Sequence, residues 1–246
     1  MRKLLTYIIP FFLMINFTVH AEQVKTIRFA TEATYPPFEY VNEEGEIKGF
    51  DIDIAKALCK QMKAECTFSN QSFSSLIPSL MIGKFDALIS ALGVTAEREK
   101  QVSFTNSYYE PSASFAALTA KHYSLSALQG MAIGVQQSST YEKYLQVKYG
   151  SKITIKTYAS IQEAFLDLVA GRVDAVLADT PITDRWLKDN KLYTMIDKPI
   201  IDHTYFGSGY GIAVNKGNPD LLSALNQALA EIRKNGTYLK ITKQYF

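Results

Sequence analysis

Short apolar segments alternate with segments of helical apolar spacing along nearly the whole chain. Apolar runs of strand length lie at residues 26–31, 85–90, 131–135, 152–158, 173–178 and 210–216. Apolar residues recur at helical spacing at residues 50–62, 73–83, 95–101, 139–149, 160–171 and 218–236. Strands that alternate with helices in this way are typical of an α/β protein whose sheets are mainly parallel.

Several predicted helices begin with residues that favour a helix start. Thr95 and Ser160 stand at N-cap positions, and Glu163 would complete a capping box with Ser160. Asp51 lies in a first turn, where the helix dipole favours an acid, and Pro219 suits the first turn of the last helix.

One segment of the sequence occurs twice. "GKFDALISA" at residues 83–91 and "GRVDAVLAD" at residues 171–179 share a glycine, a basic residue, Asp-Ala and an aliphatic run in register. Helix, glycine turn and strand thus recur in two successive α/β units, which predicts two similar lobes. Because no low-complexity linker separates them, we expect two extended crossings, at residues 109–114 and 203–209.

The repeated strands also predict a ligand site. In open parallel sheets, ligands lie beyond the carboxyl ends of the strands. The repeated strands end at Ser90 and Ala91 in one lobe and at Asp179 in the other, so these residues are expected to face a shared cleft. The predicted lobes are residues 22–111 with 207–246 and residues 112–206.

The first 21 residues have the features of a signal peptide. Two basic residues precede a long apolar stretch, and "VHA" at residues 19–21 fits the small-residue pattern before a cleavage site. The alternative is a retained anchor, but Pro10 and Asn16 interrupt a stretch shorter than the roughly 20 apolar residues of a spanning helix. We predict removal of residues 1–21 and export to the periplasm.

Charge argues against a polyanionic partner. The predicted signal peptide holds two of the 26 basic residues and no acidic residue, so 24 basic residues face 24 acidic ones in the rest of the chain. Because nucleic acids are bound by clustered Lys and Arg, and no basic run occurs, we expect no nucleic-acid partner.

The two cysteines, Cys59 and Cys66, lie seven positions apart on a predicted helix end and the strand after it. In an exported chain an even pair favours a disulfide, although two buried free thiols are the alternative. A metal site would need more ligands than these cysteines, His122 and His203 supply. We expect no metal and no other cofactor.

An arginine and an aspartate are placed to bind a zwitterion. Arg98 follows the first repeated strand, where its guanidinium could hold a carboxylate bidentately with help from backbone N–H groups. Asp179 could accept hydrogen bonds from an ammonium group. The alternatives are an exposed Arg98 paired with Glu97 or Glu99, and an Asp179 that only caps the helix starting near Pro181.

Aromatic residues follow the first strand in "TEATYPPFEY", residues 31–40. Its prolines stiffen the loop, so Tyr35 could offer a flat face to a guanidinium or imidazole group, with Phe73 as the other wall. Phe38 is expected in the core. No Gly-x-Ser-x-Gly elbow, phosphate-binding loop or metal-ligand cluster supports an enzyme, and "GSGYG" at residues 207–211 suits a hinge or a strand entry.

Taken together, these segments resemble the bacterial periplasmic binding proteins for polar amino acids, above all the arginine-binding and lysine/arginine/ornithine-binding members. The resemblance covers essentially the whole mature chain. It rests on "TYPPFEY", "GFDIDIAKALCKQMKAECTF", "FSSLIPSLMIGKFDALIS", "TAEREKQVSFTNSYYE", "GRVDAVLAD", "YFGSGYGIAV" and "NGTYLKI". It implies a two-lobed Venus-flytrap fold that closes on one amino acid and delivers it to an ABC importer in the inner membrane.

The resemblance also implies ligand contacts. Arg98 would hold the ligand carboxylate, helped by Thr95 or nearby backbone and by Thr140 from the second lobe. Asp179 and Ser90 would hold the ammonium group. The full implied set is Glu32, Tyr35, Phe73, Ser90, Ala91, Gly93, Thr95, Arg98, Gln137, Thr140 and Asp179.

Within that set, Tyr35 and Phe73 would flank the ligand side chain, and Glu32 or Gln137 would meet its far end. The resemblance further implies that Cys59 and Cys66 form a disulfide.

Two residues depart from the family pattern. Gly93 stands where relatives often have a side chain that helps to bind the ammonium group, so one contact would be missing. Ser138 stands where glycine is usual before the second-lobe threonine, which could shift the local backbone.

The predicted function is therefore periplasmic binding of a basic amino acid by a monomer. L-Arginine is the first choice, with lysine, ornithine or histidine behind it, and the permease of an ABC importer is the protein partner. The alternative is an exported dehydratase-like enzyme on the same fold, for which Glu32 and Asp179 would be the acid or base candidates.

Overall fold

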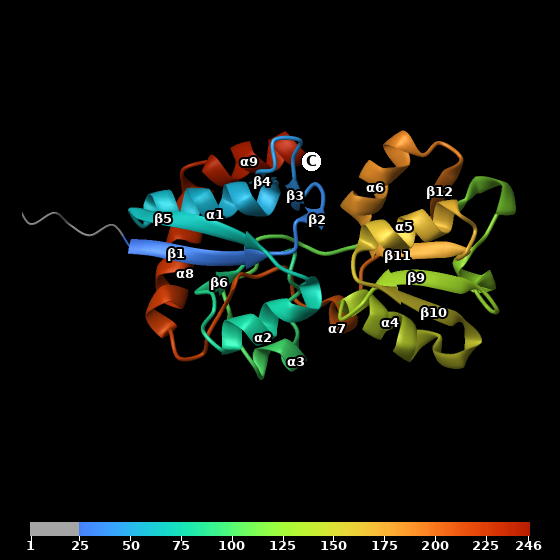
Figure 1. The fold of residues 1–246 in the computed structure, drawn as a ribbon, viewed down its shortest axis with the longest axis horizontal. Coiled ribbons are helices and arrows are strands. Elements are labelled where there is room, and N and C mark those ends of the chain that lie inside the picture. Colours follow the sequence, from blue (N-terminus) through green and yellow to red (C-terminus); the bar gives the residue numbers. More distant parts are fainter. Residues whose placement is uncertain (1–24) are drawn as a thin grey trace, which may run out of the picture.

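Two lobes lie side by side in the computed structural model, each built on a five-stranded sheet with helices on both faces (Figure 1). The structure describes residues 25–246, so the predicted signal peptide lies outside the described residues. The α/β fold class and the two-lobed arrangement are confirmed.

The first lobe combines the N-terminal part of the chain with its C-terminal end. Its main strands are β1 (Lys25–Thr31), β5 (Ala64–Asn70), β6 (Ala87–Leu88), β7 (Ser103–Phe104) and β13 (Ala213–Val214), in the order β5-β1-β6-β13-β7. A small separate sheet contains β2 (Thr34–Tyr35), β3 (Glu39–Val41) and β4 (Ile47–Lys48). The helical segments are α1 (Phe50–Gln61), the 3-10 turn η1 (Phe73–Ser75), α2 (Leu76–Met81), α3 (Ala96–Glu99), α8 (Pro219–Lys234) and α9 (Thr237–Tyr245).

The second lobe is formed by the middle of the chain. Its strands are β8 (Ala113–Leu118), β9 (Ala132–Gln136), β10 (Thr154–Tyr158), β11 (Ala175–Asp179) and β12 (Tyr193–Ile200), in the order β10-β9-β11-β8-β12. Its helices are α4 (Thr140–Lys148), α5 (Ile161–Val169), α6 (Thr180–Asp189) and α7 (His203–Phe206). Short 3-10 turns are η2 (Thr119–Lys121), η3 (Leu125–Ala127) and η4 (Gly150–Lys152).

The chain passes from one sheet to the other twice, between β7 and β8 and between β12 and β13. In each five-stranded sheet one strand runs antiparallel to its neighbours, β13 in the first lobe and β8 in the second. Each of them is the first strand after a crossing. The last part of the chain thus returns to the first sheet, while the residue bounds proposed for the lobes stay a prediction.

Three predicted elements are shorter in the structure than in the sequence pattern. The helix expected at residues 73–83 divides into η1 and α2, because Pro78 has no N–H for a bond to the preceding turn and is tolerated only near a helix start. The strands expected at 85–90 and 210–216 shrink to β6 and β13, which pair with each other over two residues. After β6 the chain turns at Ala91, whose φ is 42°.

The predicted helix caps are present. Thr95 accepts a hydrogen bond from the N–H of Arg98 at 3.3 Å, and Ser160 and Glu163 form the capping box of α5. Pro219 is the first residue of α8. Local sequence therefore sets these helix starts as expected.

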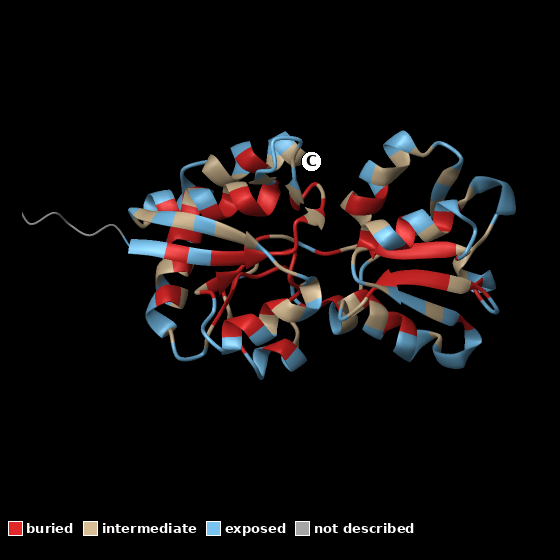
Figure 2. Cartoon of the chain, viewed as in Figure 1, coloured by how far each residue is buried: buried red, intermediate tan, exposed pale blue. Residues whose placement is uncertain are grey.

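Buried residues run through both sheets and along the inner faces of the helices, while the outer faces are exposed (Figure 2). Phe29 of β1, Leu58 of α1 and Leu225 of α8 are fully buried in the first lobe, and Phe38 is buried there as predicted. The sheets are therefore covered on both faces, as parallel sheets require.

A disulfide joins Cys59 of α1 to Cys66 of β5, with an S–S distance of 1.96 Å. The predicted disulfide is confirmed, and the free-thiol alternative is wrong. Among residues 25–246, no helix is both long enough and apolar enough to cross a membrane.

Candidate ligand-binding site

A small cavity lies between the lobes, where β1, β6, β9 and β11 end. Eight of the eleven predicted site residues line it: Glu32, Tyr35, Phe73, Ser90, Ala91, Arg98, Thr140 and Asp179. Five lining residues were not predicted: Glu39, Gln136, Ser139, Tyr141 and Tyr210. The cavity lies at the carboxyl ends of parallel strands, as expected for an open α/β sheet.

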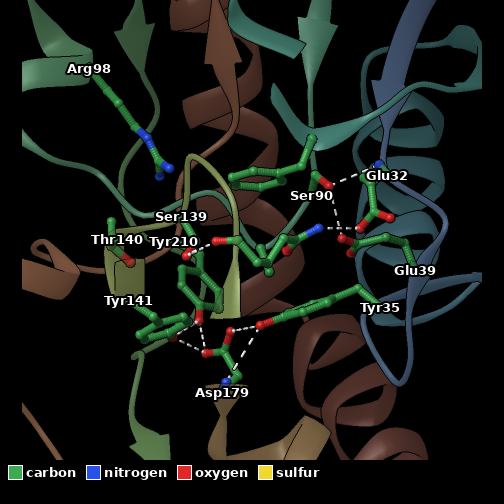
Figure 3. A pocket seen from close by; sticks show the side chains of 13 residues that line it. Glu32, Tyr35, Glu39, Ser90, Arg98, Ser139, Thr140, Tyr141, Asp179 and Tyr210 are labelled. Atoms are coloured by element: carbon green, nitrogen blue, oxygen red, sulfur yellow. Dashed lines mark hydrogen bonds between the residues drawn. The ribbon is translucent and has the colours of Figure 1, made fainter. Parts of the chain in front are cut away.

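Asp179, the last residue of β11, is buried on one wall of the cavity (Figure 3). Its carboxylate accepts hydrogen bonds from the hydroxyls of Tyr35 at 2.6 Å, Tyr141 at 2.5 Å and Tyr210. Although α6 begins at the next residue, the Asp179 side chain makes no capping hydrogen bond. The helix-cap alternative is therefore wrong, and the carboxylate belongs to the cavity.

Asp179 titrates near neutral pH, between its protonated and its ionised form. Burial raises the pKa of Asp179 to about 7, and the hydrogen bonds from Tyr141 and Tyr35 only partly oppose this effect. A cation that entered the cavity would restore the ionised form, because an opposite charge nearby favours it.

Arg98 reaches the cavity from the short helix α3 on the side opposite to Asp179 (Figure 3). Arg98 is 9% exposed, and its guanidinium donates to the carbonyl of Gly93 at 2.9 Å and to that of Ser138 at 3.2 Å. The guanidinium also lies 5.5 Å from the centre of the Phe73 ring. The alternative of an exposed Arg98 paired with a neighbouring glutamate is wrong. Burial lowers the pKa of Arg98 to about 10, so the group stays charged at neutral pH.

Glu32 and Gln136 meet across the cleft at a third point of the cavity. The amide Nε2 of Gln136 donates to the Glu32 carboxylate at 3.3 Å, and the Thr34 hydroxyl also donates to it. The hydroxyl of Ser90 accepts a hydrogen bond from the backbone N–H of Glu32 at 3.0 Å. Burial raises the pKa of Glu32 to about 7, and the bonds from Thr34 and Gln136 partly oppose it.

The structure places Gln136 in the cavity instead of the predicted Gln137. Successive side chains of a strand point to opposite sides, so only one of two consecutive glutamines at the end of β9 can face the cleft. Gln136 is buried, whereas Gln137 is half-buried and its N–H bonds to the carbonyl of Tyr158.

Gly93 and Thr95 also lie outside the cavity lining. A Cβ atom at Gly93 would stand 2.6 Å from the carbonyl oxygen of Phe206, so the close approach of that backbone requires glycine here. The Thr95 hydroxyl is engaged in capping α3. Both residues support Arg98, Gly93 through its carbonyl and Thr95 through the helix start.

Tyr141 and Tyr210 were missed because they come from segments with no chemical motif. Tyr141 is the second residue of α4, and Tyr210 lies in "GSGYG", for which the sequence suggested a hinge or a strand entry. Their hydroxyls lie 3.0 Å apart, and both donate to Asp179. Only the return of the C-terminal segment brings Tyr210 to this place.

One buried guanidinium, that of Arg98, and three buried carboxyl groups, those of Glu32, Glu39 and Asp179, line the cavity. Of the three carboxyl groups, Glu32 and Asp179 lie in separate surroundings. No ion pair within residues 25–246 involves Arg98, Glu32 or Asp179. Buried charges are ordinarily paired, so these three groups are arranged for charges that a ligand brings. The complement is a molecule with one carboxylate and two cationic groups.

Within the same part of the chain, no group of three or more His, Cys, Asp and Glu side chains is placed to hold a metal ion. The polar groups of the cavity are carboxylates, hydroxyls, an amide and a guanidinium. Such groups recognise a polar organic molecule through hydrogen bonds and charge.

Residues 27–246 match the model of the bacterial extracellular solute-binding proteins, family 3. The chain is a family 3 solute-binding protein. It is 48% identical over 234 residues to ABC transporter arginine-binding protein 1 of Escherichia coli, covering 95% of this chain and 96% of that protein. The family is described as extracellular, in agreement with the predicted export, and relatives such as the lysine/arginine/ornithine-binding protein of Escherichia coli are named as periplasmic.

Two solved structures share the fold of this protein over most of its length. One is a periplasmic binding protein of Salmonella typhimurium, described for its high arginine specificity, which superimposes with a TM-score of 0.87 at 42% sequence identity. The superposition covers 91% of this chain and 100% of the Salmonella chain. An ancestral amino acid-binding protein, described as a precursor of cyclohexadienyl dehydratase, gives a TM-score of 0.81 at 30% identity and covers 90% and 95% of the two chains. The fold alone is therefore shared by proteins that bind and by a lineage that leads to an enzyme.

Proposed function

We propose that this protein binds L-arginine in the periplasm and delivers it to the permease of an ABC importer. The observation that carries the proposal is the set of unpaired buried charges, Arg98 on one side and Glu32 with Asp179 on the other. Arginine has one carboxylate, one ammonium and one guanidinium group, so it matches each of these charges. The arginine-binding relatives support the same ligand.

The carboxylate of the ligand would lie on Arg98. A guanidinium holds a carboxylate with two parallel hydrogen bonds, which a lysine could not reproduce. Thr140, at the N-terminus of α4, lines the cavity close to this end and adds a donor from the second lobe. The carboxylate would thereby connect the two lobes.

The two cationic groups of the ligand would lie on the two carboxylates. We assign the ammonium group to Asp179 and Ser90, and the guanidinium to Glu32 and Gln136. The carboxylate of Glu32 accepts two guanidinium N–H groups, and the Gln136 amide oxygen accepts another. Tyr35 would stack on the aliphatic and guanidinium part of the ligand.

Binding would favour the closed arrangement of the lobes. Tyr35 with Asp179 and Glu32 with Gln136 already form hydrogen bonds across the cleft in this structure. A ligand that touches both lobes makes all its contacts only when the cleft is closed, so it shifts the population towards that state. We further propose that the protein acts as a monomer.

A thermal-shift screen against the common amino acids tests this function. A ligand that binds only the folded state raises the melting temperature by mass action. The largest shift is expected with L-arginine, and smaller ones with lysine, ornithine and histidine. A largest shift with an acidic or apolar amino acid would refute the proposed ligand.

The dehydratase alternative is less well supported. It would use Glu32 or Asp179 as a general acid or base, and both have a pKa near the working range of such groups. However, each carboxylate is already engaged by hydroxyl or amide donors, as expected of a group that holds a cation. Turnover of a cyclohexadienyl acid without arginine binding would favour the enzyme.

A further inference from the structure

Two buried carboxyl groups lie outside the proposed ligand contacts, one at the cavity wall and one behind it. Glu39 of β3 and Asp51 of α1 are 1% and 0% exposed, their hydrogen-bond partners Ser90 and Ala91 are consecutive residues, and the charge of Asp51 acts on Glu39. Among residues 25–246, no Lys, Arg or His side chain forms an ion pair with either of them. A buried pair of acids without a cation needs a physical explanation.

Each of the two carboxyl groups has one oxygen with hydrogen-bond donors and one without. Asp51 Oδ2 accepts hydrogen bonds from the N–H of Ala91 and the hydroxyl of Tyr108, both at 2.7 Å, and Glu39 Oε1 accepts one from the hydroxyl of Ser90 at 2.9 Å. The other two oxygens, Glu39 Oε2 and Asp51 Oδ1, are buried and have no donor from residues 25–246. Two ionised carboxylates buried near each other would repel each other and leave both oxygens unsatisfied.

We infer that a single proton, carried by Glu39, bridges these two oxygens, and that the resulting acid pair fixes the hydroxyl of Ser90 as a hydrogen-bond acceptor for the ligand. One O–H group on Glu39 that donates to Asp51 satisfies both atoms at once. The proton belongs on Glu39 because Asp51 accepts two other hydrogen bonds, which stabilise its charged form.

The titration of the two groups points the same way. Burial, and next the charge of Asp51, raise the pKa of Glu39 well above its ordinary value. Burial raises the pKa of Asp51 only to about 6, because the hydrogen bonds from Ala91 and Tyr108 oppose it. Glu39 is therefore the protonated partner at neutral pH.

The consequence for Ser90 follows from its single hydrogen. Because that hydrogen is committed to Glu39, the hydroxyl can only accept further hydrogen bonds. One of its lone pairs accepts from the N–H of Glu32, and the other remains for a donor in the cavity. The pair thus makes Ser90 selective for an N–H group of a cationic ligand, an inference that rests on the proposed function.

Asp51 positions the neighbouring residue in the same way. Its bond to the N–H of Ala91 holds a non-glycine residue at a φ of 42°, a conformation that costs energy. Ser90 and Ala91 both line the cavity, so the acid pair supports this stretch of its wall.

The proton can be detected without any ligand. At about pH 9, where Glu32 and Asp179 are ionised, the infrared spectrum should still show the carbonyl band of a buried carboxylic acid. Glu39→Gln should remove this band, and the control Glu44→Gln, at an exposed turn of the same sheet, should keep it. Absence of the band in the wild-type protein, or its survival in Glu39→Gln, would overturn the inference, whatever the protein binds.

A double-mutant cycle tests the effect on Ser90. Glu39→Leu and Ser90→Ala should each weaken arginine binding by about tenfold, the worth of one lost hydrogen bond to a charged group, and the double variant should lose no more than either. Glu39→Gln should restore the affinity lost in Glu39→Leu, since its amide can donate to Asp51 and accept from Ser90. Additive losses, or an equal loss in Glu39→Gln, would contradict the positioning role.

The two sets of results separate this inference from the proposed function. If the wild-type protein binds no arginine, the ligand assignment fails, while the infrared measurement still decides whether the acid pair exists. If arginine binds and the cycle is additive, the function stands and the role of Glu39 is refuted.

Discussion

The hydroxyl of Tyr35, in the first lobe, donates a hydrogen bond to the carboxylate of Asp179, in the second lobe, at 2.6 Å. Tyr210, from the returning C-terminal segment, donates to the same carboxylate. Asp179 lies on a strand of the second lobe, and its hydrogen-bond donors come from both lobes. A ligand ammonium group at this point would join a network that already connects the lobes.

Replacement of Asp179 by asparagine should weaken arginine binding by about tenfold or more, because an ammonium group loses its charged acceptor. The tyrosine hydroxyls keep an oxygen to which they can donate, so the fold should be retained. Calorimetric titration with arginine measures the loss. Asp189→Asn, at the exposed end of α6, is the matched control and should bind as the wild type does; an equal affinity in Asp179→Asn would remove Asp179 from the site.

Arg98→Lys should also lower arginine affinity, by about tenfold to a hundredfold, although the positive charge is kept. Lysine cannot donate two parallel hydrogen bonds to a carboxylate while also bonding the carbonyls of Gly93 and Ser138. Affinity measured beside that of Arg185→Lys, an exposed residue of α6, tests this. Wild-type affinity in Arg98→Lys would show that charge alone suffices there.

Gln136 and its neighbour Gln137 offer a direct test of the site as the structure has it. Gln136→Leu should reduce the preference for arginine over lysine by about tenfold, since the amide that faces the guanidinium end is lost. Gln137→Leu should leave the preference within about twofold. The prediction fails if Gln137 has the larger effect in competition experiments with both amino acids.

The raised pKa values of Glu32 and Asp179 predict how stability depends on pH without ligand. Both carboxyls titrate at about 7 in the folded protein, above their ordinary values, so the folded state holds more protons than the unfolded state between about pH 4 and pH 7. Their contribution is fully present below about pH 4 and is lost as the pH rises through 7. Chemical denaturation of wild type and of Glu32→Gln with Asp179→Asn should show that the wild type loses more stability between pH 5 and pH 8.

The same groups predict the opposite trend for binding. A cationic ligand needs both carboxylates ionised, so arginine affinity should rise from pH 5 to about pH 7 and level off above it. Below pH 7, binding should release protons to the solvent. Calorimetry in two buffers that differ in their enthalpy of ionisation measures this release, and net proton uptake would contradict the assignment.

The sequence was sufficient for the architecture and for the two residues of the site that have a positional signal. Arg98 and Asp179 follow the two copies of a repeated strand, and strand ends of this kind meet at a cleft. Their burial, and the lack of an ion pair with either of them in the described part of the chain, could not be predicted, because both depend on the other lobe. A helix cap and an exposed ion pair were reasonable local alternatives until those contacts were known.

Other residues reach the site through contacts between segments that lie far apart in the sequence, and local sequence patterns do not predict such contacts. Tyr210 reaches Asp179 from a segment that returns after a long excursion through the second lobe. The choice between Gln136 and Gln137 depends on which side of β9 faces the cleft, and two consecutive glutamines give no clue to that. Glu39 lies in the segment "TYPPFEY", yet its proposed role depends on its burial beside Asp51, which is distant in the sequence.

The central claim is that the unpaired charges of the cavity select a ligand with one carboxylate and two cations. Calorimetric titration of the exported protein with L-arginine and with L-citrulline tests it most directly, since citrulline has nearly the shape of arginine but a neutral end. We predict one arginine bound per chain, with an affinity about a hundredfold higher than that for citrulline. Equal affinities, or tighter binding of citrulline, would contradict the account.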